Sequence, residues 1–247
     1  MSPRGLTIAT VGHSHEMTVT PDEIAAGLRP APLALFDLDR TLYPGSSLRP
    51  LAAVLRRRGL VGRGDIARSV VGDAKFRRVG ASDAFAERVC TRALETMRGT
   101  STAELEDVAE ETASIVLERC RPSLRLALRL HQEAGSLCVL LSASPQELVA
   151  VLARRLGMYR GVGTLAEVAN GRYTGRLGAP FCYGEGKLRR LEQAVGPVDL
   201  STAWSYADSA SDLPLLERCA HPVVVAPSRD LRRIARSRGW LVIEGSS

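Results

Sequence analysis

Asp37-Leu38-Asp39-Arg40-Thr41 is the stretch that decides the fold of this 247-residue chain. It follows the apolar run Leu33-Ala34-Leu35-Phe36, which has the composition of a buried strand in a parallel sheet. Two carboxylates one residue apart raise each other's pKa, and a metal ion beyond the strand end would neutralise them. The pair also suits covalent phosphoryl transfer, with one carboxylate as nucleophile and the other handling protons. The alternative interpretation is a cap on the following turn or helix.

A second apolar run, Val139-Leu140-Leu141, leads into a hydroxyl-rich turn that begins at Ser142. Ser144 to Glu147 has the spacing of a capping box with proline at the first helical position, which predicts that a helix begins there. Free backbone N–H groups at such a helix start bind anions, and Ser142 stands at the strand end beside them. The alternative is an ordinary connection from strand to helix.

The segment from Gly184 to Lys187 opens a predicted helix that continues from Leu188 to Val195 and ends at Gly196. Only two of the 33 basic residues are lysines, Lys75 and Lys187. A lysine at a helix start is unfavourable for the helix dipole. These two facts favour a functional role for Lys187 over the alternative of a solvated side chain.

A last segment, Ser205 to Asp212, predicts a strand, a loop with two carboxylates and a helix. Asp212 could simply cap that helix. Asp208 stands at the strand end and has no such role. It is the natural third carboxylate for Mg²⁺, which prefers a few oxygen ligands and retains waters.

An acidic pair, a hydroxyl, a lysine and a second acidic pair thus occur in this order, three of them at predicted strand ends. Over about residues 33–245 the chain resembles the haloacid dehalogenase (HAD) superfamily, whose four motifs have this character and order. It looks most like the phosphoserine-phosphatase-like branch, in which a helical cap directly follows the first motif. The neighbourhoods that carry this closer resemblance are Tyr43-Pro44-Gly45-Ser46-Ser47, Gly171-Arg172-Tyr173-Thr174-Gly175 and residues 208–216.

The order of elements predicts an α/β fold: a Rossmann-like parallel sheet with helices on both faces, plus an all-helical cap. Residues 33–43 and 122–247 form the predicted core. In residues 44–121 apolar residues recur at three- and four-residue steps, which predicts a cap of about four helices. Residues 1–32 are expected to be a flexible leader. Asn170-Gly171 is typical of a tight hairpin.

The composition and net charge of the chain restrict the kinds of molecule that it could bind. The net charge of +6 permits nucleic-acid binding, but the arginines are scattered and aromatic residues are only 4% of the chain, which disfavours it. An anionic substrate explains the positive charge equally well. Five cysteines without a CxxC pair argue against a disulfide framework. No stretch is long and apolar enough to span a membrane, and the leader lacks the apolar core of a signal peptide, so we expect a cytoplasmic protein without a membrane partner. We also expect it to be a monomer or a homodimer.

The resemblance implies roles for individual residues. Asp37 would attack phosphorus and carry an aspartyl-phosphate. Asp39 would protonate the leaving alcohol and then deprotonate the hydrolytic water, while Thr41 orients the site. The implied phosphate-binding residues are Ser142, Ala143 and Lys187. The implied Mg²⁺ ligands are Asp37, the backbone carbonyl of Asp39, Asp208 and, in support, Asp212.

The implied function is a Mg²⁺-dependent phosphomonoester hydrolase acting on a small phosphorylated metabolite. Asp39 favours a phosphatase or phosphotransferase over a dehalogenase, because a halide leaving group needs no proton whereas an alkoxide does. A phosphotransferase using the same intermediate, a catalytically silent binding protein of this fold and a basic nucleic-acid-binding protein remain alternatives.

Three parts of the sequence bear on substrate specificity: the first motif, the turn after the second apolar run, and the cap. Arg40 replaces the glycine that many superfamily members have there, and we expect it to point away from the phosphate. Ala143 and Ser144 stand where phosphoserine phosphatases usually have two glycines, which lowers the expectation of phosphoserine as the substrate. In the cap, Arg56-Arg57-Arg58 and Lys75-Phe76-Arg77-Arg78 could select an anionic leaving group, the alternative being solvated helix faces.

Overall fold

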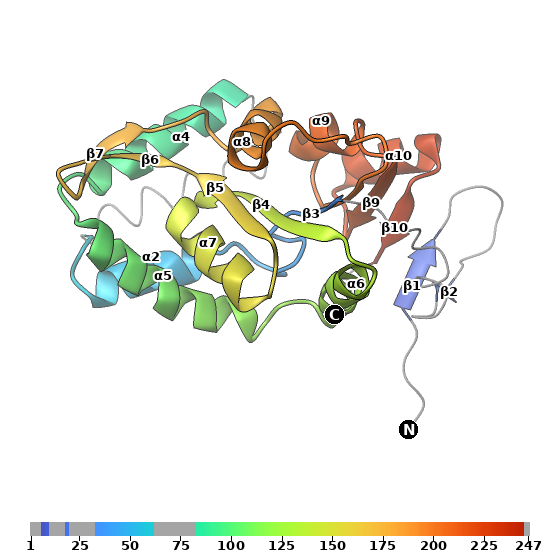
Figure 1. Cartoon of the computed structure of the whole chain (residues 1–247), viewed down its shortest axis with the longest axis horizontal. Helices are drawn as coiled ribbons and strands as arrows, with labels where there is room; N and C mark the ends of the chain where they lie inside the picture. Colours follow the sequence, from blue (N-terminus) through green and yellow to red (C-terminus); the bar gives the residue numbers. More distant parts are fainter. Residues whose placement is uncertain (1–5, 10–17, 20–32, 62–82, 245–247) are drawn as a thin grey trace.

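The structure is a computed structural model that describes residues 6–9, 18–19, 33–61 and 83–244 (Figure 1). Its main sheet has the strand order β2-β1-β10-β9-β8-β3-β4-β5. The strands are β1 (Leu6–Ala9), β2 (Thr18–Val19), β3 (Leu33–Phe36), β4 (Leu137–Pro145), β5 (Arg160–Thr164), β8 (Trp204–Ala207), β9 (His221–Val225) and β10 (Leu241–Ile243). From β10 to β5 every neighbouring pair is parallel. The predicted parallel sheet is confirmed.

Two strands of the leader lengthen this sheet. β1 pairs antiparallel with β10, and β2 pairs antiparallel with β1. The sequence pattern predicted a flexible segment here, so these strands are a difference from the prediction. Their formation has a simple cause: β10 would otherwise be an edge strand with unpaired backbone groups, which a short run such as Leu6–Ala9 can satisfy.

Helices cover both faces of the sheet. The described helices that do so are α6 (Pro122–Glu133), α7 (Gln146–Arg155), α8 (Glu185–Val195), α9 (Leu213–Leu216) and α10 (Arg229–Arg238). Three further described helices, α2 (Leu48–Arg57), α4 (Asp83–Thr96) and α5 (Thr102–Leu117), precede them in the chain. Successive residues of β3 face opposite sides. Ala34 and Phe36 are buried against α6 and α7, whereas Leu33 and Leu35 are buried on the side of α8 and α9, where α10 also packs (Figure 1). The predicted two-sided α/β fold is confirmed.

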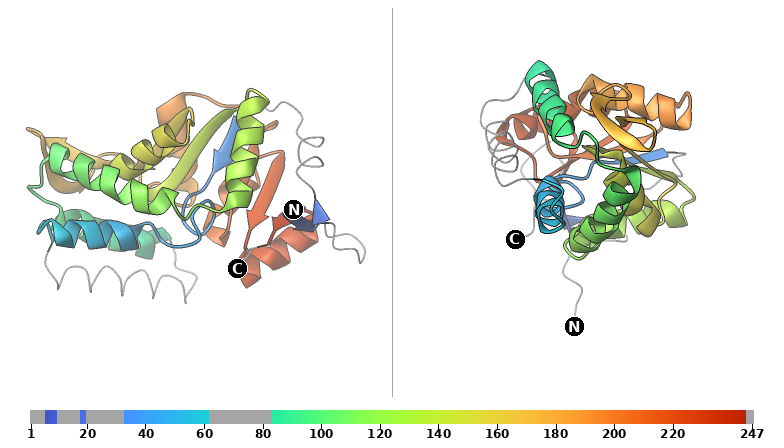
Figure 2. Two further views of the ribbon diagram at one scale, coloured as in Figure 1. Left: turned by 90° about the horizontal axis from the view of Figure 1, so that it is seen from below. Right: turned by 90° about the vertical axis from the view of Figure 1, so that its left-hand side faces the viewer.

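The helices between β3 and α6 gather at one end of the molecule, together with a hairpin from a distant part of the chain (Figures 1 and 2). The hairpin consists of β6 (Ala166–Ala169) and β7 (Arg172–Leu177). Its turn residues Asn170 and Gly171 have φ angles of 51° and 71°, as a tight two-residue turn requires. Tyr173 of β7 is buried in a cluster with apolar residues of α2 and α5, and its backbone N–H donates to Thr100 O. The hairpin thus packs on the helical module, although the sequence pattern assigned it to the core.

The described residues also show several local features. α8 ends at Gly196, which has a φ angle of 82°. The Ser228 side chain caps α10 by accepting from Leu231 N. All five cysteines are free thiols, four of them buried. Within the described residues, no helix is long and apolar enough to cross a bilayer. Lys75 to Arg78 lie outside the described residues.

Candidate active site

The sheet brings the first and last acidic motifs together. Phe36, the last residue of β3, lies in register with Leu140 of β4 on one side and with Tyr206 of β8 on the other. Asp37 therefore leaves the sheet between these two strands, and its N–H donates to Tyr206 O at 3.0 Å. Asp208 follows β8 at the same end of the sheet. In open α/β sheets the carboxyl ends of the strands are where ligands bind.

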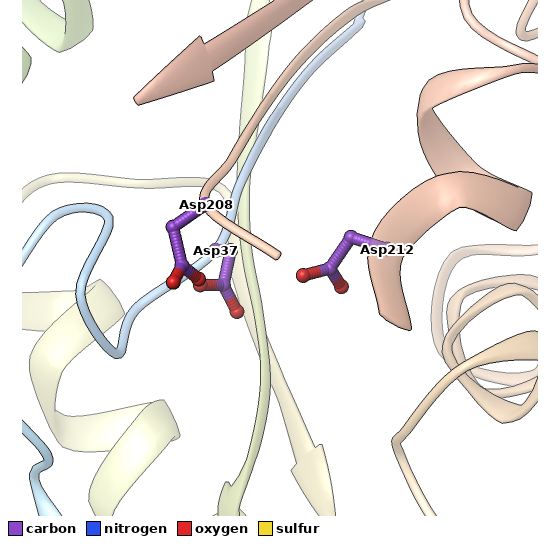
Figure 3. Close-up of side chains that lie close together, drawn as sticks. All are labelled: Asp37, Asp208 and Asp212. Atoms are coloured by element: carbon purple, nitrogen blue, oxygen red, sulfur yellow. The ribbon is translucent and has the colours of Figure 1, made fainter. Parts of the chain in front are cut away.

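Three carboxylates form a buried cluster at this position. Oxygen atoms of Asp37, Asp208 and Asp212 all lie within 4.8 Å of one another. Figure 3 shows the carboxylates of Asp37 and Asp208 side by side, with Asp212 facing them from the opposite side. Asp37, Asp208 and Asp212 are only 6%, 5% and 3% exposed, respectively. A compact set of carboxylate oxygens is the type of donor set that suits Mg²⁺, so the residues fit the predicted metal.

Lys187 enters the cluster from the first turn of α8. Its Nζ donates to Asp37 Oδ1 at 2.7 Å and to Asp212 Oδ1 at 2.5 Å, and the residue is 3% exposed. Burial alone would lower the pKa of Lys187, but the negative charges of Asp212 and Asp37 outweigh this effect and raise it above its usual value. The lysine therefore stays charged.

The negative charge of the three carboxylates is not fully neutralised by nearby positive charge. Burial raises the pKa of Asp208 to about 7, although the nearby Arg40 opposes that shift. Burial also raises the pKa of Asp212, against the effect of Lys187. Both shifts have the same meaning: a carboxylate here is harder to ionise than in water, mainly because it is buried and to a smaller extent because its neighbours are also negative. A divalent cation would remove this penalty.

Asp39 lies apart from the cluster and is held by two serines. Ser47 N donates to Asp39 Oδ1 at 2.5 Å, and Ser144 Oγ donates to Asp39 Oδ2 at 3.1 Å. The two serine hydroxyl oxygens are 2.7 Å apart, and both serines are buried. Burial raises the pKa of Asp39, the hydrogen bond from Ser47 N partly opposes that rise, and the charge of Asp37 adds to it. A raised pKa suits a residue that must carry a proton.

The predicted capping box at Ser144 is wrong. β4 continues to Pro145, α7 begins at Gln146, and no side chain caps its first turn. The Ser144 hydroxyl is used instead by Asp39, 105 residues away in the sequence. A pattern of four neighbouring residues cannot reveal a partner at that distance, so the local interpretation failed.

The last part of β4 reaches the site through Ser144, which donates to Asp39. Ser142 is 1% exposed, and its Oγ accepts from Ser144 N at 3.2 Å. The carbonyl of Ala143 accepts from Thr164 Oγ1 at 2.7 Å, which fixes this part of β4 to the end of β5. Thr164 carries no motif signal in the sequence. Thr41 Oγ1 donates to Asp37 Oδ2 at 2.8 Å.

Arg40 makes a contact that the sequence pattern did not predict. Its Nε donates to Asp208 Oδ2 at 2.6 Å, and the expectation that it points away from the phosphate stays a prediction. The arginine is thus ion-paired with a predicted metal ligand. Its neighbours in the sequence gave no indication of this, because Asp208 is 168 residues away.

Gly186 is required for the position of Lys187. A Cβ atom built on Gly186 would lie 1.9 Å from the carbonyl oxygen of Phe181, so Gly186→Ala must displace backbone beside the lysine. We expect a loss of about 2 kcal/mol in the free energy of unfolding, as overpacking typically causes. Urea denaturation measures this loss. Equal stability of the Gly186 variant and the parent protein would contradict the prediction.

Comparison with known proteins agrees with this geometry. A family model described as haloacid dehalogenase-like hydrolase matches residues 34–217. Phosphoserine phosphatase SerB1 of Mycobacterium tuberculosis is 34% identical over 94% of this chain and 78% of the relative. A probable phosphatase of the same organism is 33% identical over 96% of this chain and 84% of the relative. A crystal structure of a protein of unknown function from Bordetella pertussis is 34% identical, with a TM-score of 0.74 over 86% of this chain and 97% of that one. The resemblance inferred from the four motifs is therefore confirmed, and this chain belongs to the haloacid dehalogenase-like hydrolase family.

Proposed function

We propose that this chain is a Mg²⁺-dependent phosphomonoester hydrolase that acts on a small phosphorylated metabolite through an aspartyl-phosphate on Asp37. The phosphatase class follows from the family and from relatives of 33% and 34% identity that are named phosphatases. The observation that carries the proposal is the state of Asp39. It lies two residues after the proposed nucleophile in the chain, is held by Ser47 and Ser144, and has a pKa raised by burial. A site that releases a halide has no need of such an acid.

In the first step an oxygen of Asp37 attacks phosphorus and the bond to the leaving oxygen breaks. Thr41 and Lys187 each donate a hydrogen bond to Asp37, so they hold its carboxylate in a fixed orientation. Asp39 gives its proton to the leaving alkoxide. Lys187 also balances part of the negative charge that an incoming phosphate would add.

In the second step Asp39, now ionised, takes a proton from water while the water oxygen attacks phosphorus. The bond between Asp37 and phosphorus breaks, which restores the carboxylate and yields inorganic phosphate. Asp37, Asp208 and the backbone carbonyl of Asp39 would hold the metal ion, with Asp212 in support. Bound Mg²⁺ supplies charge neutralisation for the phosphoryl group and the clustered carboxylates.

Fewer observations support the proposed substrate class, a small phosphomonoester, than support the reaction type. The relative SerB1 is named for phosphoserine, and we extend from it only that the substrate is a small phosphomonoester. Ala143 and Ser144 replace the two glycines expected for phosphoserine, and Ser144 is already engaged by Asp39. We further propose that the enzyme is cytoplasmic, that it is a monomer or a homodimer, and that it has no membrane or nucleic-acid partner.

Removal of metal tests the proposal directly. We expect release of p-nitrophenol from p-nitrophenyl phosphate to fall at least about 10²-fold in EDTA, since the uncompensated carboxylates would repel the phosphate. Excess Mg²⁺ should restore the rate. A melting curve in EDTA serves as the control that the fold persists. Undiminished turnover in EDTA would contradict the metal requirement, and phosphate found on an added alcohol would favour a phosphotransferase.

A further inference from the structure

Arg40 is held by its backbone on one side of the acidic cluster. It has a φ angle of 66°, in the left-handed region that favours glycine. Its N–H donates to Gly45 O, and its carbonyl accepts from Arg121 Nη2 at 3.4 Å. A strained arginine fixed in this way indicates a position where the side chain, and not backbone freedom, is needed.

The guanidinium group meets the one member of the cluster that Lys187 does not. Lys187 bonds to Asp37 and Asp212, whereas Arg40 Nε bonds to Asp208 Oδ2 at 2.6 Å. Among the described residues, three clustered carboxylates therefore meet two cations. The charge of Arg40 also interacts with those of Asp37 and Asp39, so it lies in the field of the whole first motif.

Asp208 cannot serve Arg40 and a metal ion equally well. A Mg²⁺ ligand oxygen lies about 2.1 Å from the ion, and a guanidinium on the same carboxylate would repel the ion across that short distance. The Arg40 side chain is 37% exposed, whereas that of Asp208 is only 7% exposed. The arginine can therefore turn towards water, but the aspartate cannot.

We propose that Arg40 is an internal counter-ion that competes with Mg²⁺ for Asp208. This inference rests on the proposed function, because it concerns the same metal site. Without metal, Arg40 neutralises the carboxylate that Lys187 leaves unpaired and so stabilises the empty site. When Mg²⁺ binds, this ion pair is either broken or left with two cations that repel each other across one carboxylate, and both outcomes lower the affinity for the metal. Arg40 thereby sets the Mg²⁺ concentration at which the site fills.

The experiment is a calorimetric titration of MgCl₂ into the metal-free protein, for the parent chain, Arg40→Gly and Arg40→Gln. Glycine suits the left-handed backbone, and glutamine removes the charge while keeping a polar side chain. We expect both variants to bind Mg²⁺ about fivefold to tenfold more tightly, which corresponds to the loss of one partly exposed ion pair. In EDTA Arg40→Gln, which keeps the backbone strain, should melt at lower temperature than the parent, and Mg²⁺ should raise the melting temperatures of both variants more than that of the parent.

Arg49→Gln is the matched control, since it removes the same charge from an exposed position nine residues further along the chain. It should leave the Mg²⁺ affinity unchanged. Equal or weaker Mg²⁺ binding by both Arg40 variants would overturn the counter-ion role and leave the proposed function standing. Absence of Mg²⁺ binding to the parent and to every variant would overturn both.

Discussion

Asp37→Asn is expected to reduce turnover at least about 10³-fold while the protein stays folded, because an amide oxygen is too weak a nucleophile to attack phosphorus. The substitution keeps the shape of the side chain, but Thr41 Oγ1 and Lys187 Nζ donate to different oxygens of Asp37, so the single amide oxygen of asparagine retains only one of these two hydrogen bonds. It also removes one of three mutually repelling carboxylates. We therefore expect little change in stability and a nearly complete loss of chemistry. The measurement is kcat for p-nitrophenyl phosphate at saturating Mg²⁺, beside a thermal melt.

Asp199→Asn provides the control for this variant. Asp199 is a carboxylate outside the cluster whose Oδ1 accepts from Ser201 N, so its loss removes the same charge without touching the site. The control should keep the activity of the parent chain. Near-normal turnover by Asp37→Asn would show that another residue is the nucleophile.

Asp39→Asn is expected to slow alkyl phosphates about 10²- to 10⁴-fold and aryl phosphates much less. An alkoxide leaves poorly unless it is protonated, whereas p-nitrophenolate leaves without help. Asn at this position can still accept the hydrogen bond from Ser47 N, so the site should keep its shape. The decisive measurement is the ratio of kcat values for an alkyl and an aryl phosphomonoester, compared between the parent and the variant.

Comparing an alkyl with an aryl phosphomonoester separates the loss of proton donation from general damage to the active site. A distorted site would slow both substrates to the same extent. Equal slowing would therefore exclude Asp39 as the acid, even if the overall loss were large. Restored turnover of the alkyl substrate at low pH would not be expected, since an amide does not regain the missing proton.

The sequence predicted the parallel sheet and the meeting of its motifs because strand ends are a property of local pattern. Each of Asp37, Ser142 and Asp208 follows an apolar run, and parallel strands must place such positions at one edge. Lys187 was predicted from its rarity and its unfavourable place at a helix start. No pairing between strands had to be known for these inferences.

The remaining features depend on contacts between distant segments. Ser144 matched a local capping pattern, yet its partner is Asp39, and Arg40 pairs with Asp208. The direction of a polar side chain in such a place is decided by whichever charged group the fold brings near it. The same is true of Tyr173, whose hairpin leaves the core and packs on α2 and α5. Periodicity within a segment contains no information on these choices.

Ser47, whose N–H holds Asp39, is also the residue that immediately precedes α2, the first helix of the module at the far end of the molecule. The proposed proton donor is thus anchored to the start of this helical module. A change that shifts the start of α2 would also shift the hydrogen bond on Asp39, and with it the strength of the acid. The position of the helical module and the chemistry of the leaving group are therefore mechanically coupled in this architecture.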